Sequence, residues 1–308
     1  MSADAALVHQ PFAGRAWGLF FAMAGAIGFS GKAIIVKLSY AYGVDAVQTI
    51  FYRMVFALPF FLAMAWWAGR GRARLSGEQW RTVLALGFLG YYLGSMLDFL
   101  GLQYISAGLE RLILYLNPTL VVLLTWLLLG RRATRVQVMG MAISYTGVVM
   151  VFGQELGLAG WSTVWGASLV TLSALSYAYY LMRSGEMIRQ IGSLRLVGWA
   201  TAVACVLCIV QFFVLRPVSA LAVPSAVVQL GILNATACTV LPVWFVMLGV
   251  ERLGAGLASQ TGMVGPMATI AMGIVLLDEP FNRWILLGTL LVLAGVAWAS
   301  WGSRKAAA

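Results

Sequence analysis

The chain has 308 residues, of which 62% are hydrophobic and only 10% are charged, and its mean hydropathy is +0.91. Soluble domains carry roughly a quarter charged residues, so one or two soluble domains could not bury this much apolar surface. The net charge of +10 forms no basic stripe on a soluble domain, which argues against nucleic acid as a partner. Runs of about 20 apolar residues, each long enough to cross a bilayer as a helix, instead predict a polytopic helical membrane protein.

Ten apolar spans follow one another along the chain. They cover 16–39, 46–68, 80–102, 108–129 and 136–152 in the first half, and 164–182, 194–215, 225–248, 256–277 and 283–301 in the second. No connection between them is long enough for another folded domain. The first span carries Lys32 too deep for a cleaved signal peptide, so we expect this span to remain in the mature protein.

The first half of the sequence recurs in the second half at a shift of 148 residues, the difference between Pro266 and Pro118. The matching pairs are Trp17 and Trp165, Gly101 and Gly249, Gly108 and Gly256, Pro118 and Pro266, Gly140 and Gly288, and Gly147 and Gly295. The match needs no gap, so nearly the whole chain is a duplication. We therefore expect a leader at 1–15, a first five-helix repeat at 16–153, a second at 154–302 and a tail at 303–308.

The positions of the 20 Lys and Arg residues predict the orientation. With the N-terminus in the cytoplasm, Arg216 and Arg283 fall outside, four lie within spans and the remaining 14 fall inside. Because cytoplasmic loops carry the excess of Lys and Arg, both termini are predicted to be cytoplasmic. Five spans are an odd number, so the second repeat must cross the membrane in the opposite sense. The predicted fold is an all-α membrane protein with ten transmembrane helices in two inverted five-helix repeats, an architecture typical of secondary transporters.

This pattern resembles the drug/metabolite transporter superfamily, and within it the EamA-type ten-helix exporters. The resemblance is carried by the turn at 107–109, the central Pro118 and the glycine-spaced fifth helix, each of which recurs in the second half. The sequence looks closest to the bacterial aromatic amino-acid exporters, which implies location in a bacterial inner membrane. EamA-type proteins often end the fourth helix with Gly-Glu. This chain has Arg131 at that position, and the acidic form appears only in the second copy, as Glu279.

Each repeat begins with a helix that carries an indole near one end and small, polar or charged residues along the same face. These residues are Trp17, Gly28 and Lys32 in the first repeat, and Trp165, Ser176 and Tyr180 in the second. A face turned only to lipid would not carry Ser176 and Lys32. The two stripes therefore line a central cavity or, alternatively, serve the close helix packing that small residues allow.

Six charged residues lie within the spans, all in the first repeat. They are Lys32, Lys37, Arg53, Asp98, Glu110 and Arg111. Buried charges are costly and should pair or face water. Lys32 either receives a substrate carboxylate or pairs with Asp98 or Glu110. The other three cations are expected to extend outward to the interface.

The third span places Tyr91, Ser95 and Asp98 on one helix face. Asp98 binds an amino group, carries a proton or forms a structural ion pair. Pro118 and Pro266 each remove a helix hydrogen bond near the midplane, and we expect them to kink their spans as candidate hinges. Other polar or aromatic residues in the eighth span or beside these prolines complete the predicted substrate site: Tyr115, Asn117, Asn234, Trp244, Gln260 and Met263.

Catalysis finds little support in the sequence. The only His is His9, in the leader, and no phosphate-binding loop or metal motif is present, so neither a metal nor another cofactor is predicted. Cys205 and Cys208 form a C-x-x-C motif, which inside a span is more typical of small apolar residues than of a redox pair.

The predicted function is export of small amphipathic metabolites by alternating access, with aromatic or neutral amino acids as the first candidate class. The predicted partners are a small-molecule substrate and the lipid bilayer, and a monomer is sufficient. Three alternatives remain open at this point: export of drug-like cations, export of phosphorylated metabolites, and a polytopic membrane enzyme.

Overall fold

The computed structural model describes the backbone of residues 12–130 and 133–307, and the side chains of these residues except 12–15, 251, 254–260 and 301–307. This part of the chain forms helices and connecting turns, without a strand. The α-helices are α2 (Phe12–Tyr40), α3 (Ala46–Gly69), α4 (Gly77–Leu86), α5 (Gly94–Gly101), α6 (Ala107–Leu114), α7 (Asn117–Leu129), α8 (Arg135–Ala159), α9 (Trp161–Ile191), α10 (Ser193–Leu215), α11 (Ser225–Ala235), α12 (Leu241–Thr261), α13 (Val264–Leu277) and α14 (Arg283–Ala307). Two π-helical turns, η1 (Gly87–Leu93) and η3 (Thr236–Val240), and one 3-10 turn, η2 (Val218–Leu221), complete the helical elements.

The length and composition of these helices are those of a multi-pass membrane protein. Seven helical segments of the described chain are long and apolar enough to cross a bilayer, and α6 with α7, bent by 41°, would make an eighth. The full set of ten spans stays a prediction, because α9 is not among these segments and α13 has only 14 residues. α9 also continues nine residues beyond its predicted end at 182, through a polar stretch that contains Arg183, Glu186 and Arg189.

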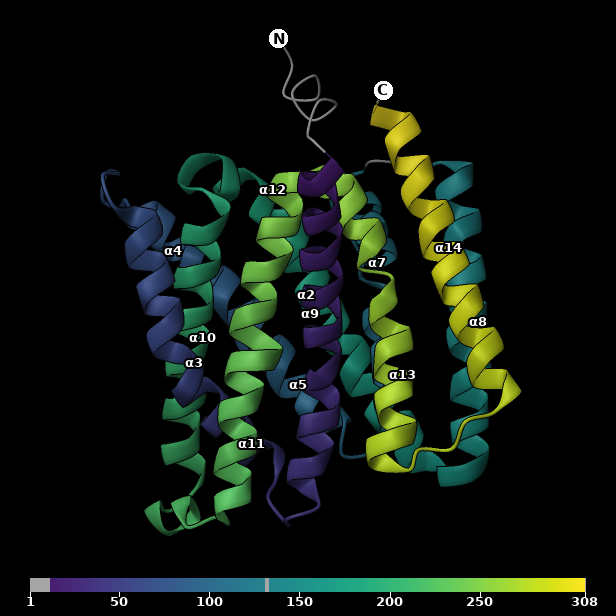
Figure 1. Ribbon diagram of the computed structural model, residues 1–308, viewed down its shortest axis with the longest axis horizontal. Helices are drawn as coiled ribbons and strands as arrows, with labels where there is room; N and C mark the ends of the chain where they lie inside the picture. Colours follow the sequence, from purple (N-terminus) through teal and green to yellow (C-terminus); the bar gives the residue numbers. More distant parts are fainter. Residues whose placement is uncertain (1–11, 131–132, 308) are drawn as a thin grey trace.

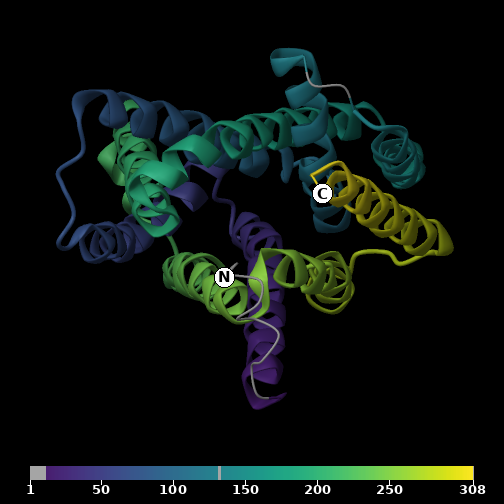
Figure 2. The same cartoon turned by 90° about the horizontal axis from the view of Figure 1, so that it is seen from above.

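The helices stand side by side in one bundle. The purple start of α2 and the yellow end of α14 lie at the same end of this bundle (Figure 1). Seen from above (Figure 2), yellow α14 runs alongside teal α8 at one edge, and dark blue α3 lies at the opposite edge. The most extensive helix contacts are those of α8 with α14, α2 with α12 and α3 with α10.

The first helix of each repeat packs against the third helix of the other repeat. Gly18 of α2 lies against Arg252 and Leu253 of α12, and Gly166 of α9 lies against Tyr104 and Ile105, just after α5. All three positions in the second contact correspond to those in the first at the 148-residue shift. The two repeats are therefore related by a pseudo-twofold exchange of partners.

The last helices of the two repeats make a second symmetric contact. A Cβ added to Gly147 of α8 would lie 2.5 Å from the carbonyl oxygen of Gly288 in α14, and one added to Gly295 would lie 2.5 Å from that of Gly140. Only glycine allows two helix backbones to approach this closely. Because Gly140 also lies against Ala299, α8 and α14 run antiparallel. The first residues of α8 and of α14 are thus at opposite ends of the bundle, as inverted repeats require.

The predicted kink at Pro118 is present, because α6 and α7 are bent by 41° at the break beside it. Both prolines occupy the first turn of a helix, Pro118 in α7 and Pro266 in α13, and each break precedes its proline. A residue in the first turn has no intrahelical acceptor for its N–H, so each proline starts a new helix at little cost just after the break. The two π-turns, η1 and η3, were not predicted, and they too fall at equivalent positions of the two repeats.

Candidate functional site

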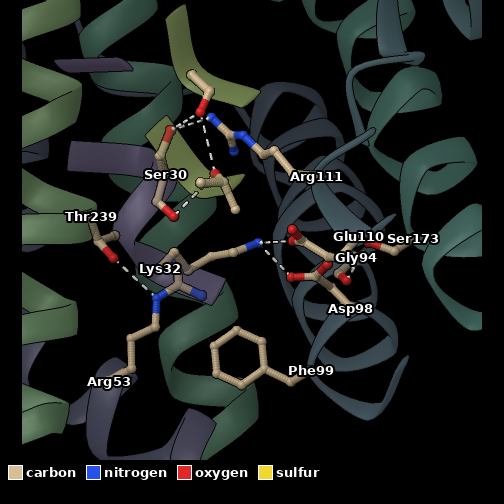
Figure 3. Close-up of polar contacts among 12 residues, drawn as sticks. Ser30, Lys32, Arg53, Gly94, Asp98, Phe99, Glu110, Arg111, Ser173 and Thr239 are labelled. Atoms are coloured by element: carbon tan, nitrogen blue, oxygen red, sulfur yellow. Dashed lines mark hydrogen bonds and ion pairs between the residues drawn. The ribbon is translucent and has the colours of Figure 1, made fainter. Parts of the chain in front are cut away.

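A buried ion-pair cluster joins three helices of the first repeat. The Lys32 ammonium on α2 lies 2.5 Å from Asp98 Oδ2 on α5 and 3.0 Å from Glu110 Oε1 on α6 (Figure 3). Glu110 is 0% and Asp98 3% exposed. The alternative in which Lys32 pairs with a carboxylate is thus the arrangement that the structure shows, and Lys32 pairs with both carboxylates.

Local helix geometry positions the three side chains. Ser106 caps α6 by accepting a hydrogen bond from the Leu109 amide (2.9 Å), which places Glu110 in the first turn of that helix. A carboxylate in the first turn is favoured by the helix dipole. Asp98 follows η1 by five residues, and Gly31, next to Lys32, lets α2 approach Cys238 of η3 closely.

The two arginines within the predicted spans, Arg53 and Arg111, point inward, which corrects the expectation that they extend to the interface. Arg53 Nε donates to Thr239 Oγ1 (3.1 Å), and its guanidinium lies 5.4 Å from the centre of the Phe99 ring (Figure 3). Arg111 Nη2 lies 3.4 Å from Ser30 Oγ. Buried cations need a polar or aromatic partner, and in both cases the partner belongs to another helix. A single span could not reveal it.

Several buried polar atoms near this cluster have no hydrogen-bond partner within the described part of the chain. They are Asp98 Oδ1, Glu110 Oε2, Arg53 Nη1 and both side-chain polar atoms of Asn234. Asn234 is linked to Arg53 through Thr239, whose hydroxyl donates to the Asn234 backbone carbonyl (2.8 Å) and accepts from Arg53. Because an unpaired buried polar group is costly, these atoms identify where water or a polar ligand fits.

A cluster of three tyrosines joins η1 to α9, seven residues before Asp98 along the chain. Tyr91 in η1 donates to the Tyr180 hydroxyl (3.3 Å), and the Tyr177 ring stacks on that of Tyr180 with centroids 5.5 Å apart. Tyr180 is the repeat equivalent of Lys32. The two clusters are thus built on equivalent helices, one with charges and one with aromatic rings.

Hydroxyls from α9 complete the surroundings of the tyrosine cluster. Ser176 donates to the Leu89 carbonyl (2.6 Å) and Ser173 to the Gly94 carbonyl (2.7 Å). These carbonyls lie in η1 and directly after it, where a π-turn leaves the helix ladder irregular. Ser176 is therefore placed near the predicted site, and its hydroxyl is occupied by the backbone.

The remaining predicted site residues are scattered over the bundle. Ser95 is half-buried between Tyr91 and Asp98, and Asn117 starts α7 with its Oδ1 buried and unpartnered among the described residues. The Tyr115 hydroxyl donates to the Gly262 carbonyl, which joins the break before α7 to the break before α13. Met263 packs in the apolar core between helices, and the Gln260 side chain lies outside the described residues.

Four other predicted residues lie away from the two clusters. The indoles of Trp17, Trp165 and Trp244 are 57%, 60% and 57% exposed on the helix surfaces. Gly28 faces η3 and Pro242, where an added Cβ would lie 2.7 Å from the proline ring. At Gly28 the small residue therefore serves helix packing, the alternative that the sequence left open.

A second polar cluster closes one end of the bundle around the start of α6. Glu279 accepts from the amides of Ala107 (2.8 Å) and Gly108 (3.4 Å) and lies 3.3 Å from the Lys37 ammonium. Glu155, at the end of α8, accepts from both the amide and the hydroxyl of Ser106. A cavity of about 310 Å³ opens beside these side chains. Glu279, the acidic residue that is present only in the second repeat, thus binds the N-terminal amides of α6 in the first repeat.

No group of three or more His, Cys, Asp or Glu residues in the described chain could hold a metal ion. A bundle of apolar helices, built from two copies that exchange partners around buried charges, defines a polytopic membrane transporter. The EamA-like transporter family matches the chain twice, at residues 16–153 and 164–301, and the chain belongs to that family. It is therefore a multi-pass membrane transporter and not an enzyme.

Relatives and solved structures agree with this assignment. The uncharacterized transporter YcbK of Bacillus subtilis is 29% identical, with 85% of this chain and 86% of that protein aligned. An uncharacterized transporter of Archaeoglobus fulgidus is 25% identical, with 87% and 92% aligned. A solved crystal structure aligns with a TM-score of 0.60 at 20% identity and covers 94% of this chain and 99% of that one, which shows a shared fold.

Proposed function

We propose that this protein exports aromatic or large neutral amino acids by alternating access, with the substrate held between the charged cluster and the tyrosine cluster. The observation that carries the proposal is the spacing of these two clusters. Asp98 lies seven residues after Tyr91 on the same helix, which corresponds to about 10 Å. A flat solute with charged groups at one end and a ring at the other fits this interval.

The charged cluster supplies groups for both ends of an amino-acid zwitterion. Lys32 receives the substrate carboxylate, and Asp98 with Glu110 receives the ammonium group, so the substrate inserts into an ion pair that already exists. Asp98 Oδ1 and Glu110 Oε2 have no partner in the described chain and can accept the ammonium protons. Ser95 lies between this end and the tyrosines.

The tyrosine cluster supplies the apolar end of the site. Tyr91, Tyr177 and Tyr180 present rings that interact with an aromatic side chain by edge or face contacts. The breaks before Pro118 and Pro266 serve as hinges, since each divides a span of its own repeat and the hydrogen bond from Tyr115 to the Gly262 carbonyl joins the two breaks.

We further propose that all ten predicted helices cross the membrane, that both termini are cytoplasmic, and that the membrane is the bacterial inner membrane. The inward excess of Lys and Arg supports this orientation. The repeats described above exchange partners across the pseudo-twofold axis, so rocking one repeat against the other would expose the site to each side in turn.

Counterflow in proteoliposomes tests the substrate assignment. Labelled L-phenylalanine inside vesicles is exchanged against an external panel of phenylalanine, phenylalaninamide, an organic cation and a sugar phosphate. Saturable exchange with phenylalanine and weak exchange with its amide is expected, because only the acid offers a carboxylate to Lys32. Preference for the cation or the sugar phosphate would instead support one of the two alternative substrate classes.

A charge-neutral double variant tests the role of Lys32. Lys32→Met with Asp98→Asn removes one cation and one anion, so the net charge of the cluster is unchanged, and Glu110 is the carboxylate that loses its ammonium partner. We expect the preference for phenylalanine over its amide, about ten- to a hundredfold from a charged hydrogen bond, to disappear. If a well-folded double variant keeps that preference, Lys32 does not bind the carboxylate.

A further inference from the structure

The Asp98 and Glu110 carboxylates share a single ammonium group. Their paired oxygens lie 2.5 and 3.0 Å from Lys32 Nζ, so these two oxygens are at most 5.5 Å apart, the sum of the two distances. Both carboxylates are more than nine-tenths buried, and each has a second oxygen without a partner in the described chain. Two carboxylates this close and this dry repel each other when both are ionised.

The other groups around the pair do not remove this excess of negative charge by direct contact. Arg53 of α3 is directed to Thr239, and Arg111 of α6 is directed to Ser30. The remaining titratable neighbours are neutral hydroxyl and thiol groups: Tyr40 of α2, Tyr115 after α6, Cys205 and Cys208 of α10, and Cys238 of η3. Lys32 is the only cation in the described chain that contacts both carboxylates.

We propose that Asp98 and Glu110 together hold one exchangeable proton, and that the substrate ammonium group displaces it, so that the protein exchanges substrate for a proton. This inference rests on the proposed function and adds the coupling ion. On substrate binding, the carboxylic O–H bond breaks and the proton passes to water. The ammonium group takes its place at the carboxylate oxygen, and Lys32 stays protonated throughout.

This exchange has a direction and an electrical consequence. A zwitterion moving out carries no net charge, whereas the proton moving in carries one positive charge. An inward proton gradient therefore drives export, and the membrane potential adds to the drive. A proton and an amino acid cannot occupy the pair together, which is what couples the two fluxes.

The number of protons moved per substrate tests the inference directly. Purified protein in weakly buffered detergent with a pH-indicator dye is mixed with L-phenylalanine, and proton release is compared with bound label. We expect about one proton per bound substrate for the wild type. For Glu110→Gln, which leaves Asp98 and Lys32 as a balanced pair, we expect a ratio near zero even where affinity falls.

Glu186→Gln is the matched control, because Glu186 is an exposed carboxylate on α9 outside both clusters. Its ratio should equal that of the wild type. In proteoliposomes, an imposed pH gradient should drive accumulation with the wild type and Glu186→Gln but not with Glu110→Gln. Saturable phenylalanine counterflow without proton release would overturn the coupling and leave the proposed function standing. Absence of counterflow would remove both.

Discussion

Gly147 of α8 lies directly against the backbone of Gly288 in α14, and their repeat equivalents, Gly295 and Gly140, make the same contact in reverse. At the 148-residue shift Gly288 corresponds to Gly140 and Gly295 to Gly147, so the two contacts are the same contact made once by each repeat. A contact of this kind arises only when two equivalent helices meet across a twofold relation. It joins the ends of the two repeats through their backbones.

This contact predicts that alanine substitutions at two glycines of α8 have very different effects on stability. Gly147→Ala places a Cβ 2.5 Å from the Gly288 carbonyl oxygen, so the helices must separate, at a cost of about 1–3 kcal/mol. Gly153→Ala meets nothing within 4 Å and should be neutral or stabilise by about 0.5–1 kcal/mol. Thermal unfolding in detergent measures both. Equal midpoints for the two variants would show that the helices are not in contact.

The tyrosine cluster predicts a substrate-dependent effect of Tyr180. Tyr180→Leu removes a ring–ring contact of about 0.5–1.5 kcal/mol and should raise KM for phenylalanine about two- to tenfold, with little change for alanine. Tyr180→Phe keeps the ring and loses only the hydroxyl that Tyr91 contacts, so it serves as the control. A similar rise in KM for both substrates would place the ring outside the site.

The contacts of Glu279 predict that its loss makes the cavity at this end of the bundle more accessible. Glu279→Ala leaves the Ser106 cap in place but removes the acceptor of the Ala107 and Gly108 amides and the ion-pair partner of Lys37, a loss of about 0.5–2 kcal/mol. In a background without native cysteines, an Ile270→Cys reporter in the adjacent cavity should react with an impermeant maleimide about 2- to 30-fold faster. Asp278→Asn is the neighbouring control. Unchanged labelling in the Glu279 variant would mean that this carboxylate does not hold the end closed.

The inverted threading predicts opposite labelling of two equivalent linkers. Ala133→Cys lies before α8 and Pro280→Cys before α14. In intact cells, an impermeant reagent should label only Pro280→Cys, and after permeabilisation it should label both. Labelling of both linkers in intact cells would contradict the proposed orientation.

The duplication and the charged cluster could both be predicted from sequence, for different reasons. The glycine pairs recur at a constant shift, so the repeat is visible without structure. Lys32, Asp98 and Glu110 are conspicuous because charge within an apolar span must find a partner. The choice between one carboxylate and two depended on the distance between α5 and α6, which the spacing along the chain does not contain.

Other features depended on contacts between the repeats. Arg53 turns inward because Thr239, 186 residues away, accepts its hydrogen bond. Pro242 fills the space beside Gly28, although a glycine at this position could also have lined a cavity. The π-turns have no sequence signal of their own, since they accommodate the helix packed beside them.

The π-turn η1 sets the rotational phase of the helix that carries Asp98. A π-turn absorbs one extra residue, and one residue of α-helix corresponds to about 100° of rotation. If Gly77–Gly101 were a regular α-helix, Leu97 would occupy the position that Asp98 holds, and the ammonium of Lys32 would meet a hydrocarbon side chain. The ion pair between Lys32 and Asp98 therefore depends on this one irregular turn. Conversion of η1 to regular α-helix would break the pair while the rest of the helix stays folded.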